Sequence, residues 1–411
     1  MVPVPPRTPQ EALALLERAP FPDALLRLLE RLASLGHEAY IVGGCVRDVL
    51  LGRPLGDFDV ATSARPEEVR AAFRRTIPTG IDHGTVTVVL APKLHVEVTT
   101  YRGEGAYEDG RRPSRVVYHG DLHADLARRD FTINAFAYRP RPRTFIDDFD
   151  GLGDLGGRRI RAIGDPVERF REDGLRPMRA VRFCATLEFD LDPDTHDAIS
   201  ETLDVFVKVA AERIRDELWK LLGARRASLG LRPMWRTGLW RHVLPEPETD
   251  VEALLERVDR LPPDPPLRLA ALLDTVERRR VEPALSALKI SNRDKARIRA
   301  LLTDAARRVA CESADTAIRR AAAEIGREAV ADALAFHEAP DEQRRRVERA
   351  LRGCPMAPRE LAISGRDLAA EGIVEPGPQM GRCLARLFDY VLEDPARNER
   401  QTLLAHARKV C

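Results

Sequence analysis

The stretch that decides the fold runs from Ile41 to Thr62 and reads IVGGCVRDVLLGRPLGDFDVAT. Near its end, Asp57 and Asp59 stand one residue apart in a short strand pattern, and alternate residues of a strand share one face. Both carboxylates are therefore predicted to face one hard cation. The earlier pair Gly43-Gly44 lets backbone N–H groups approach a phosphate closely. The stretch indicates metal-dependent chemistry on a nucleoside triphosphate.

Two charged residues follow the glycine pair. Arg47 and Asp48 lie at the start of a predicted helix, Val46–Leu51, and the N-terminus of a helix favours anions. The two side chains are expected to hold the triphosphate and orient the site. A tight turn between strand and helix, closed by an ion pair, explains the same residues without any ligand.

Around this stretch the hydrophobic pattern changes between helix and strand up to about residue 160. Residues 10–35 predict one amphipathic helix, and a short apolar strand follows from Ala39 to Gly43. The other elements predicted for this part are a strand at 57–62, a helix at about 66–74, and a strand pair at 85–90 and 95–100. This part is therefore expected to be an α+β head with a mixed sheet and helices.

The second half of the chain shows a different pattern, because helical periodicity dominates after about residue 165. The predicted fold class is an α+β N-terminal head followed by an all-α neck, body and tail. Five segments are expected: an N-terminal helical segment at 1–35, the head at 36–164, the neck at 165–225, the body at 226–353 and the tail at 354–411.

Length and charge limit the classes of function. The 411 residues suffice for about two to four domains. Charged residues make up 32% of the chain, but the formal net charge is only +1, so any site for a polyanion must be a local patch. Of the 66 basic residues, 6 are lysine and 60 are arginine. A GC-rich genome explains that bias more simply than function does.

Cysteine use and hydropathy bear on the compartment. The six cysteines form no C-x-x-C pair and no cluster with histidine at zinc-ligand spacing. A reducing, cytoplasmic environment is the simplest interpretation. The proline-rich segment Met1–Gln10 lacks the apolar core of a secretory signal, and no stretch approaches about 18 uninterrupted apolar residues. Neither secretion nor a membrane partner is expected.

A second cluster, Arg128–Ala135, reads RRDFTINA and contains one of only three asparagines in the chain. On a helix, Asp130 and Asn134 are four residues apart and share a face. That face is expected to hydrogen-bond sugar hydroxyls. A solvated helix start capped by Asp130 is the alternative.

A third cluster, Arg169–Phe183, reads RFREDGLRPMRAVRF. An aspartate and three arginines recur in it at every third position and would form one stripe on a helix. Cytosine and adenine each present an amino donor beside a ring-nitrogen acceptor, which a carboxylate next to an arginine complements. Each unpaired group at a wrong base would cost about 1 to 3 kcal/mol. Pro177 disfavours helical geometry at Arg176, so a turn at this point is one alternative, and a solvated arginine face is another.

Taken together and in this order, GGxxRD, DxD, RRDFTINA and EDxxR resemble the motifs of the bacterial-type (class II) tRNA nucleotidyltransferases, the CCA-adding enzymes, and of the related bacterial poly(A) polymerases. The resemblance continues through Ala211–Leu218 and, weakly, through Ile363–Leu368 and Gly377-Pro378, so it covers most of the chain. It implies template-independent addition of C, C and A to the 3′ end of tRNA from CTP and ATP. It also implies a nucleotidyltransferase head and a tRNA-binding tail.

Carried onto this chain, the resemblance implies that Asp57 and Asp59 are catalytic residues that bind magnesium ions, with Glu97 as a further catalytic carboxylate. The ions would activate the tRNA 3′-hydroxyl and neutralise the departing pyrophosphate. Asp173 and Arg176 would read the base. The residues implied to bind the nucleotide are Gly43, Gly44, Arg47, Asp48, Arg129, Asp130, Asn134, Asp173, Arg176, Arg179 and Arg182.

Two segments bear on the sister activities. Phe73–Thr87 resembles the CCA-adding version, whereas the proteobacterial poly(A) polymerases carry a basic Gly-Arg-Arg-Phe-type run there. Arg102–Val116 resembles the flexible loop that full CCA-adding enzymes use when they switch from C to A, and enzymes that add only CC have a shorter loop. An enzyme that adds only A, a poly(A) polymerase and, from a different class, a noncatalytic tRNA-binding protein remain alternatives. The sequence indicates neither the oligomeric state nor the tRNA contacts of the helical half.

Overall fold

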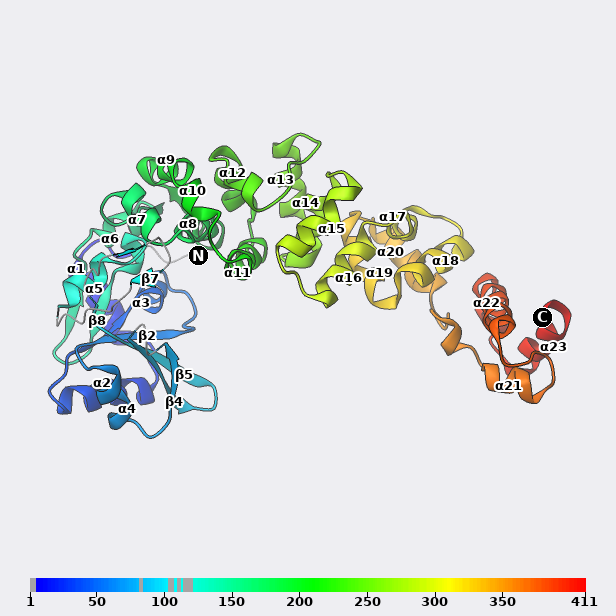
Figure 1. Ribbon diagram of the computed structural model, residues 1–411, viewed down its shortest axis with the longest axis horizontal. Helices are drawn as coiled ribbons and strands as arrows, with labels where there is room; N and C mark the ends of the chain where they lie inside the picture. Colours follow the sequence, from blue (N-terminus) through cyan, green and yellow to red (C-terminus); the bar gives the residue numbers. More distant parts are fainter. Residues whose placement is uncertain (1–4, 81–83, 103–106, 109–111, 114–120) are drawn as a thin grey trace. The chain divides into compact units, whose positions relative to one another are not determined.

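The computed structural model describes residues 5–80, 84–102, 107–108, 112–113 and 121–411 (Figure 1). The chain divides into two compact units, of which the first comprises residues 1–221 with 229–244 and the second residues 222–228 with 245–411. All strands of the described residues belong to the first unit. The finer division into five segments stays a prediction.

The first unit is built on one sheet of seven strands in the order β3-β4-β5-β2-β1-β8-β9. The sheet is mixed, as the sequence predicted. Strand β2 runs parallel to β5, and the other neighbours in the sheet are antiparallel. The strands are β1 (Ala39–Val42), β2 (Phe58–Thr62), β3 (Thr76–Gly80), β4 (Thr85–Ala91), β5 (Leu94–Thr100), β8 (Ala137–Arg139) and β9 (Thr144–Ile146). Two short pairs lie outside this sheet: β6 (Tyr107–Glu108) with β7 (Arg112–Pro113), and β10 (Arg159–Ile160) with β11 (Asp190–Leu191).

Strand β1 is buried at every residue, which fits a central position in the sheet. Alternation along the strand divides its side chains between the two faces. On one face, Tyr40 and Val42 pack with Ala61 of β2 and with Leu122 and Leu126. Since Val42 pairs in register with Asp59, this is also the face that carries the Asp59 carboxylate.

Two helices precede the first strand, α1 (Pro9–Arg18) and α2 (Asp23–Ser34). Three more lie between strands in the chain: α3 (Gly44–Leu50), α4 (Pro66–Ala72) and α5 (Leu122–Ala127). The prediction of a single helix over 10–35 was wrong, because the helix stops at Arg18 and a new one starts at Asp23. Pro20 and Pro22 lack a backbone N–H and disfavour helical geometry at the residues before them. Between the two helices, buried Phe21 stacks on Tyr138 at 5.8 Å between ring centroids.

The helices that follow β9 in the chain complete the first unit. They are α6 (Gly151–Gly156), α7 (Pro166–Glu172), α8 (Arg176–Phe183), α9 (Pro193–Glu201), α10 (Leu203–Phe206), α11 (Ala211–Leu222) and α12 (Ser228–Arg236). A π-helical turn, Cys184–Glu188, continues α8. A Cβ atom at Gly230 of α12 would lie 2.3 Å from the carbonyl oxygen of Val181, so the close packing of α12 on α8 requires glycine there.

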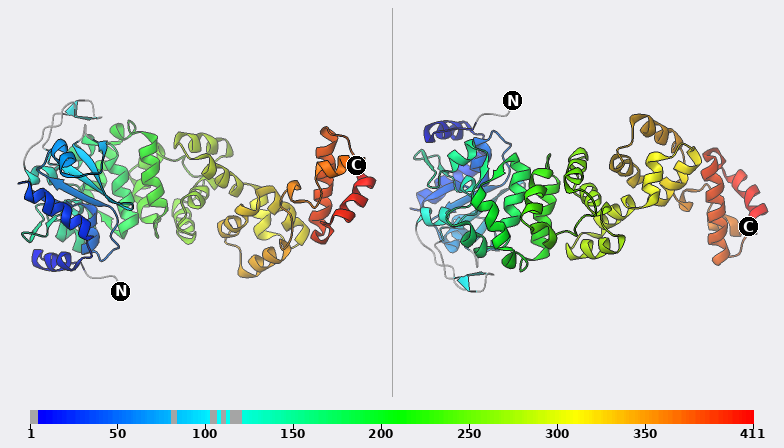
Figure 2. Two further views of the ribbon diagram at one scale, coloured as in Figure 1. Left: turned by 90° about the horizontal axis from the view of Figure 1, so that it is seen from below. Right: turned by 90° about the horizontal axis from the view of Figure 1, so that it is seen from above.

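Among the described residues the second unit contains helices joined by loops and no strand, as both views in Figure 2 show. Its helices are α13 (Val251–Arg260), α14 (Pro265–Asp274), α15 (Arg278–Ala287), α16 (Asn292–Leu301), α17 (Asp304–Cys311), α18 (Asp315–Ile325), α19 (Arg327–Phe336), α20 (Asp341–Ala350), α21 (Gly365–Ala370), α22 (Pro378–Glu393) and α23 (Arg400–Val410). Asp250, Asp264, Ser291 and Thr303 cap helix N-termini through their side chains, the interaction that such residues favour.

Two buried apolar clusters hold the second unit together, one centred on Val309, Ile318 and Val347 and the other on Leu368, Leu387 and Leu403. A disulfide bond joins Cys383 to Cys411, a pairing that the sequence analysis did not predict. Within the described residues, no helix has the length and apolar character needed to cross a membrane.

Candidate active site

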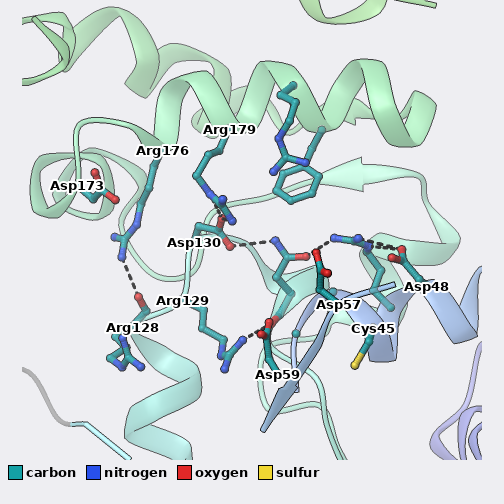
Figure 3. A pocket seen from close by; sticks show the side chains of 16 residues that line it. Cys45, Asp48, Asp57, Asp59, Arg128, Arg129, Asp130, Asp173, Arg176 and Arg179 are labelled. Atoms are coloured by element: carbon teal, nitrogen blue, oxygen red, sulfur yellow. Dashed lines mark hydrogen bonds and ion pairs between the residues drawn. The ribbon is translucent and has the colours of Figure 1, made fainter. Parts of the chain in front are cut away.

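One cavity of about 510 Å³ collects residues from all three sequence clusters (Figure 3). It contains both aspartates of the DxD motif and every residue that the resemblance assigned to the nucleotide, whereas Glu97 does not line it. The lining residues are Gly43, Gly44, Cys45, Arg47, Asp48, Asp57, Asp59, Arg128, Arg129, Asp130, Asn134, Asp173, Arg176, Arg179, Arg182 and Phe183. Sequence reasoning assigned no role to Cys45, Arg128 or Phe183.

Asp57 and Asp59 form what we call the acidic wall. Asp57 immediately precedes β2 and Asp59 is its second residue, while Phe58 between them is buried. Burial raises the pKa of Asp59, and the negative charge of Asp57 adds to this, although Arg129 opposes the shift. The acidic wall therefore places two carboxylates on one side of the cavity where their charges repel, an arrangement that a cation would relieve.

Glu97 lies beside the acidic wall but is not one of the residues that line the cavity. It pairs with Asp59 in the register of β2 and β5. Burial raises the pKa of Glu97, and the charges of Asp59 and Asp57 raise it further. The Glu97 carboxylate is therefore close enough to interact electrostatically with Asp57 and Asp59. Its catalytic role stays a prediction.

Gly43 occupies a backbone position that no other residue fits well. Its φ of 76° lies in the left-handed region, and an added Cβ atom would stand 2.8 Å from Nη1 of Arg129. The Gly43 N–H donates to the carbonyl oxygen of Phe136 at 3.2 Å, so this N–H is used by the fold and not directed to a ligand. The sequence interpretation that both glycines offer N–H groups to phosphate is wrong for Gly43.

Arg47 makes the ion pair that the ligand-free alternative predicted, and it does so inside the cavity. Its Nε and Nη2 donate to Oδ1 of Asp48 at 3.0 and 2.9 Å. Its Nη1 donates to Oδ1 of Asn134 at 2.6 Å. The guanidinium is thus fixed in place where it lines the cavity.

Asp130 and Asn134 meet, but not on a helix as the sequence predicted. Helix α5 ends at Ala127, Phe131 is extended, and a 3₁₀ turn covers Thr132–Asn134. Tertiary contacts override the local helical spacing, because Phe131 is fully buried and forms an isolated antiparallel β-bridge with Ala162. The Asn134 amide still donates to Oδ1 of Asp130, at 3.0 Å.

The carboxylate of Asp130 connects this turn to the neck. Its Oδ2 accepts a hydrogen bond from Nε of Arg179 at 2.7 Å. Burial by itself would raise the pKa of Asp130, but the charge of Arg179 and the hydrogen bonds from Asn134 and Arg179 outweigh it and hold the pKa well below its usual range. Asp130 is therefore an ionised, fully partnered carboxylate.

Arg176, Arg179 and Arg182 of α8 form what we call the arginine wall. In Figure 3, Arg176 and Arg179 extend from α8 toward the strand that carries the acidic wall. The predicted helical stripe is only partly correct, because Asp173 has extended backbone angles and precedes the helix. Pro177 sits in the first turn of α8, where its missing N–H costs nothing.

The residues expected to read a base are already engaged by the protein. Oδ1 of Asp173 accepts from the backbone N–H of Leu175 at 3.0 Å, and Oδ2 accepts from Nη2 of Arg213 at 3.0 Å. Arg176 donates to the Glu172 carboxylate at 2.5 Å and to the carbonyl oxygen of Arg128 at 2.8 Å. Both side chains still line the cavity, so a bound base would meet groups of fixed orientation.

Arg182 forms an ion pair with Glu217, a residue that sequence reasoning did not single out. Its Nε donates to Oε2 of Glu217, a buried residue of α11, at 2.5 Å. Burial lowers the pKa of Arg182 to about 10, although the charge of Glu217 opposes that shift. A glutamate within the motif-like segment Ala211–Leu218 was the available signal for this partner.

Cys45 lines the cavity beside Asp59 but is not a nucleophile. Burial, followed by the negative charge of Asp59, raises the pKa of its thiol to about 12. The thiolate is the reactive form of cysteine, so at neutral pH Cys45 remains an inert thiol.

Paired carboxylates opposite an arginine wall are the division of charge that transfer of a nucleotidyl group requires. Family models agree with this class along the chain. The model of the poly A polymerase head domain matches residues 39–161, that of the RNA- and SrmB-binding site of polymerase A matches 188–250, and that of tRNA nucleotidyltransferase domain 2 matches 267–407.

Curated relatives narrow the class. The chain is 39% identical to the CCA-adding enzyme of Limosilactobacillus fermentum, with 92% of this chain and 95% of the relative covered. It is also 39% identical to the enzyme of Leuconostoc citreum, with 93% and 95% covered. The chain belongs to the family of CCA-adding tRNA nucleotidyltransferases.

Solved structures agree with this family. The CCA-adding enzyme of Bacillus stearothermophilus, in complex with CTP, matches with a TM-score of 0.80 and 33% identity over 94% of this chain and 96% of that one. The Thermotoga maritima CCA-adding enzyme complexed with tRNA shares the fold, with a TM-score of 0.69 at 20% identity over 97% of each chain.

Proposed function

We propose that this protein adds C, C and A in order to the 3′ end of tRNA, using CTP and ATP and releasing pyrophosphate. The observation that carries the proposal is the single cavity in which the acidic wall faces the arginine wall. Phosphoryl transfer needs this division of charge, because one side positions the attacking hydroxyl and the other neutralises the phosphates. The curated relatives, which are CCA-adding enzymes, support the choice of tRNA and of these two nucleotides.

The acidic wall fits a divalent cation. Its donors are carboxylate oxygens, the ligands that Mg²⁺ prefers, and the pKa of Asp59 is raised by burial and by Asp57, so a cation there offsets repulsion. Among the described residues, no three His, Cys, Asp or Glu side chains converge on a metal position. Two carboxylates suffice, since Mg²⁺ usually takes one or two from the protein and completes its shell with water and substrate phosphates.

When bound between Asp57 and Asp59, magnesium would supply Lewis-acid chemistry that favours ionisation of the tRNA 3′-hydroxyl and stabilises charge on the phosphates. The chain's own residues would do the rest. Arg47, fixed by Asp48 and Asn134, would hold the triphosphate so that its α-phosphorus faces the hydroxyl. The oxygen would then displace pyrophosphate in line, and Arg129 beside Gly43 would help balance the charge of the leaving group.

Base choice would come from the residues that open the arginine wall. Asp173 would accept from the amino group of cytosine or adenine, and Arg176 would donate to the neighbouring ring nitrogen. Because both side chains are held by Arg213, Glu172 and a backbone carbonyl, they would keep their orientation when no base is bound. Such preorganised groups discriminate between bases without a nucleic-acid template.

The test of this function uses three tRNA transcripts that end before CCA, after C, and after CC. Each is incubated with the protein, magnesium and either CTP, ATP or both, and product lengths are read on a sequencing gel. We expect all three transcripts to be completed to CCA, and we expect EDTA to abolish the reaction.

Other outcomes of the same experiment point elsewhere. Extension of only the CC-ended transcript by a single A would identify an A-adding enzyme, and long A tails would identify a poly(A) polymerase. No extension of any transcript would contradict the proposed function. The loop segment 102–116, on which the sequence argument against CC-only addition rests, lies mostly outside the described residues.

We further propose that the protein works in the cytoplasm, where tRNA and both nucleotides are available. Cys45, Cys184, Cys311 and Cys354 are free thiols in the structure, which fits a reducing compartment. The disulfide Cys383–Cys411 would be reduced there unless its sulfurs are shielded from the thiol pool.

We propose tRNA binding by residues 354–411 on the resemblance of that segment alone.

A further inference from the structure

A single aromatic ring lies among three guanidinium groups of the cavity. Phe183 is the last residue of α8, only 4% of it is exposed, and it lines the cavity. Its ring centroid stands 3.6 Å from Cζ of Arg182, 5.2 Å from Cζ of Arg47 and 5.6 Å from Cζ of Arg179. The edge-on ring of Phe131, 5.7 Å away, completes its surroundings.

These three arginines come from different parts of the fold. Arg47 belongs to α3 of the head, whereas Arg179 and Arg182 belong to α8 of the neck. Each has its own polar partner: Asp48 and Asn134 for Arg47, Asp130 for Arg179, and Glu217 for Arg182. Phe183 is the side chain that all three share.

The ring of Phe183 can offset repulsion between the three guanidinium groups that their carboxylate partners do not remove. Each hydrogen-bonded partner fixes one edge of a guanidinium, but three cations this close to one another also repel. An aromatic face attracts a cation through its quadrupole, and a buried, desolvated ring does so more strongly than an exposed one. An aliphatic side chain of similar volume would fill the space without this attraction.

We propose that Phe183 is a positioning residue that couples the arginine holding the triphosphate to the arginines behind the base. It acts through Arg47, Arg179 and Arg182, which it keeps at fixed mutual positions before a nucleotide binds. The inference rests on the proposed function, because it gives Arg47 and the arginine wall their roles toward the nucleotide.

The chain offers a matched control in Phe189. This phenylalanine is also 4% exposed, and Cζ of Arg158 lies 5.5 Å from its ring centroid. It lines a different cavity, of about 280 Å³, and does not line the nucleotide cavity. A substitution at Phe189 therefore reports the loss of a buried ring with one cation contact, away from the site.

The experiment compares Phe183→Leu, Phe183→Tyr and Phe189→Leu with the unchanged protein. It measures KM and kcat for CTP on a transcript ending before CCA and for ATP on one ending in CC, and it measures binding of each magnesium nucleotide by calorimetry without tRNA. Thermal unfolding is recorded for every variant.

We expect Phe183→Leu to raise KM and weaken binding of both nucleotides by about ten-fold, with kcat changed by less than about three-fold. Phe183→Tyr keeps the ring and should have a KM close to that of the unchanged protein. Phe189→Leu should leave KM unchanged even if its Tm falls as much as that of Phe183→Leu. An unchanged KM in Phe183→Leu would overturn the proposal. So would a Phe183→Tyr as impaired as the leucine variant, or a Phe189→Leu with an equal rise in KM.

The binding measurement separates this inference from the proposed function. If the unchanged protein binds magnesium nucleotides but extends no tRNA, the proposed function fails while the role of Phe183 is still tested by binding. If the unchanged protein completes CCA and Phe183→Leu binds and reacts normally, only the role of Phe183 fails.

Discussion

The two walls of the cavity carry opposite charge, and they differ in how far the protein itself neutralises them. On the arginine wall, Arg176, Arg179 and Arg182 are each in an ion pair, with Glu172, Asp130 and Glu217 respectively. On the acidic wall, neither Asp57 nor Asp59 is in an ion pair or a side-chain hydrogen bond with another described residue.

This contrast shows how one small cavity serves two purposes. The arginine wall is prepared in advance, so its donors do not have to reorganise when a nucleotide arrives. The acidic wall has no ion pair among the described residues, and burial raises the pKa of Asp59 even though the charge of Arg129 opposes that shift. Charge that a fold leaves uncompensated costs stability and is expected where a ligand supplies the balance.

The largest expected effect comes from removing charge on the acidic wall. Asp59→Asn should reduce nucleotide incorporation by about 10³-fold or more, because the cation site loses one of its two carboxylates. The same change should leave Tm unchanged or raise it, since a carboxylate whose folded pKa is raised costs stability at neutral pH. Single-turnover assays and thermal unfolding measure the two effects. Retention of more than about a tenth of the activity would sink the assignment.

Asp130→Asn removes the carboxylate that pairs with Arg179 of the arginine wall. Unlike Asp59→Asn, it should lower the free energy of unfolding. The folded pKa of Asp130 is lowered, so its carboxylate stabilises the fold above the unfolded pKa of about 4, and this contribution is lost as pH falls below that value. At neutral pH the variant should lose about 2 kcal/mol of unfolding free energy, less than for a wholly buried pair because Arg179 is partly exposed. Activity should fall by about 100-fold.

Denaturant titrations at pH 7 and pH 3 check this difference. The gap in stability between the unchanged protein and Asp130→Asn should be widest at pH 7 and should narrow at pH 3, where the unfolded carboxyl is already protonated. The Asp59→Asn variant provides the control, because it should not lose stability at pH 7. Equal losses in both variants would show that the two walls do not differ in the way described.

A smaller effect is expected where the arginine wall begins. Asp173→Ala should reduce discrimination against UTP and GTP by about ten-fold, with incorporation of CTP affected less, since one acceptor for the base amino group is lost. Competition between CTP and UTP on a transcript ending before CCA gives the ratio directly. Arg213→Ala, which frees the Asp173 carboxylate without removing it, should show a weaker change in the same direction. Unchanged selectivity in Asp173→Ala would remove it from base reading.

The smallest effect is expected for Glu97→Gln. The carboxylate adjoins Asp59 in the sheet but does not line the cavity, so activity at saturating magnesium should change by less than about three-fold. A modest rise in the magnesium concentration needed for half-maximal rate should appear, because one nearby negative charge is lost. A loss as large as that of Asp59→Asn would restore Glu97 as a third catalytic carboxylate.

Local patterns gave much of the head. The apolar run of β1, the alternating strands β4 and β5 and the glycine pair at the start of α3 were all located to within a few residues, because each depends on near neighbours in the chain. The single helix expected over 10–35 failed at Pro20 and Pro22, whose effect on the backbone is also local and was overlooked. Strands β8 and β9, each three residues long, were too short for periodicity to show.

The sequence predicted which residues form the site better than it predicted how they are arranged. The motifs named thirteen of the sixteen residues that line the cavity, but Asp130 and Asn134 meet across extended Phe131 and a 3₁₀ turn and not on an α-helix. Phe183 stands inside the quoted arginine cluster, yet a phenylalanine at the end of an amphipathic helix ordinarily reads as core. Only its position between three guanidinium groups distinguishes it.

By itself the sequence determined which side chains this protein brings to its chemistry, because residue types and short spacings are written directly in the chain. Only the tertiary structure decided their partners. Arg47 meets Asn134 across 87 residues, Arg179 meets Asp130 across 49, and Arg182 meets Glu217 across 35. Such pairings depend on how distant segments of the first unit pack together, which burial of apolar surface sets and no local motif records.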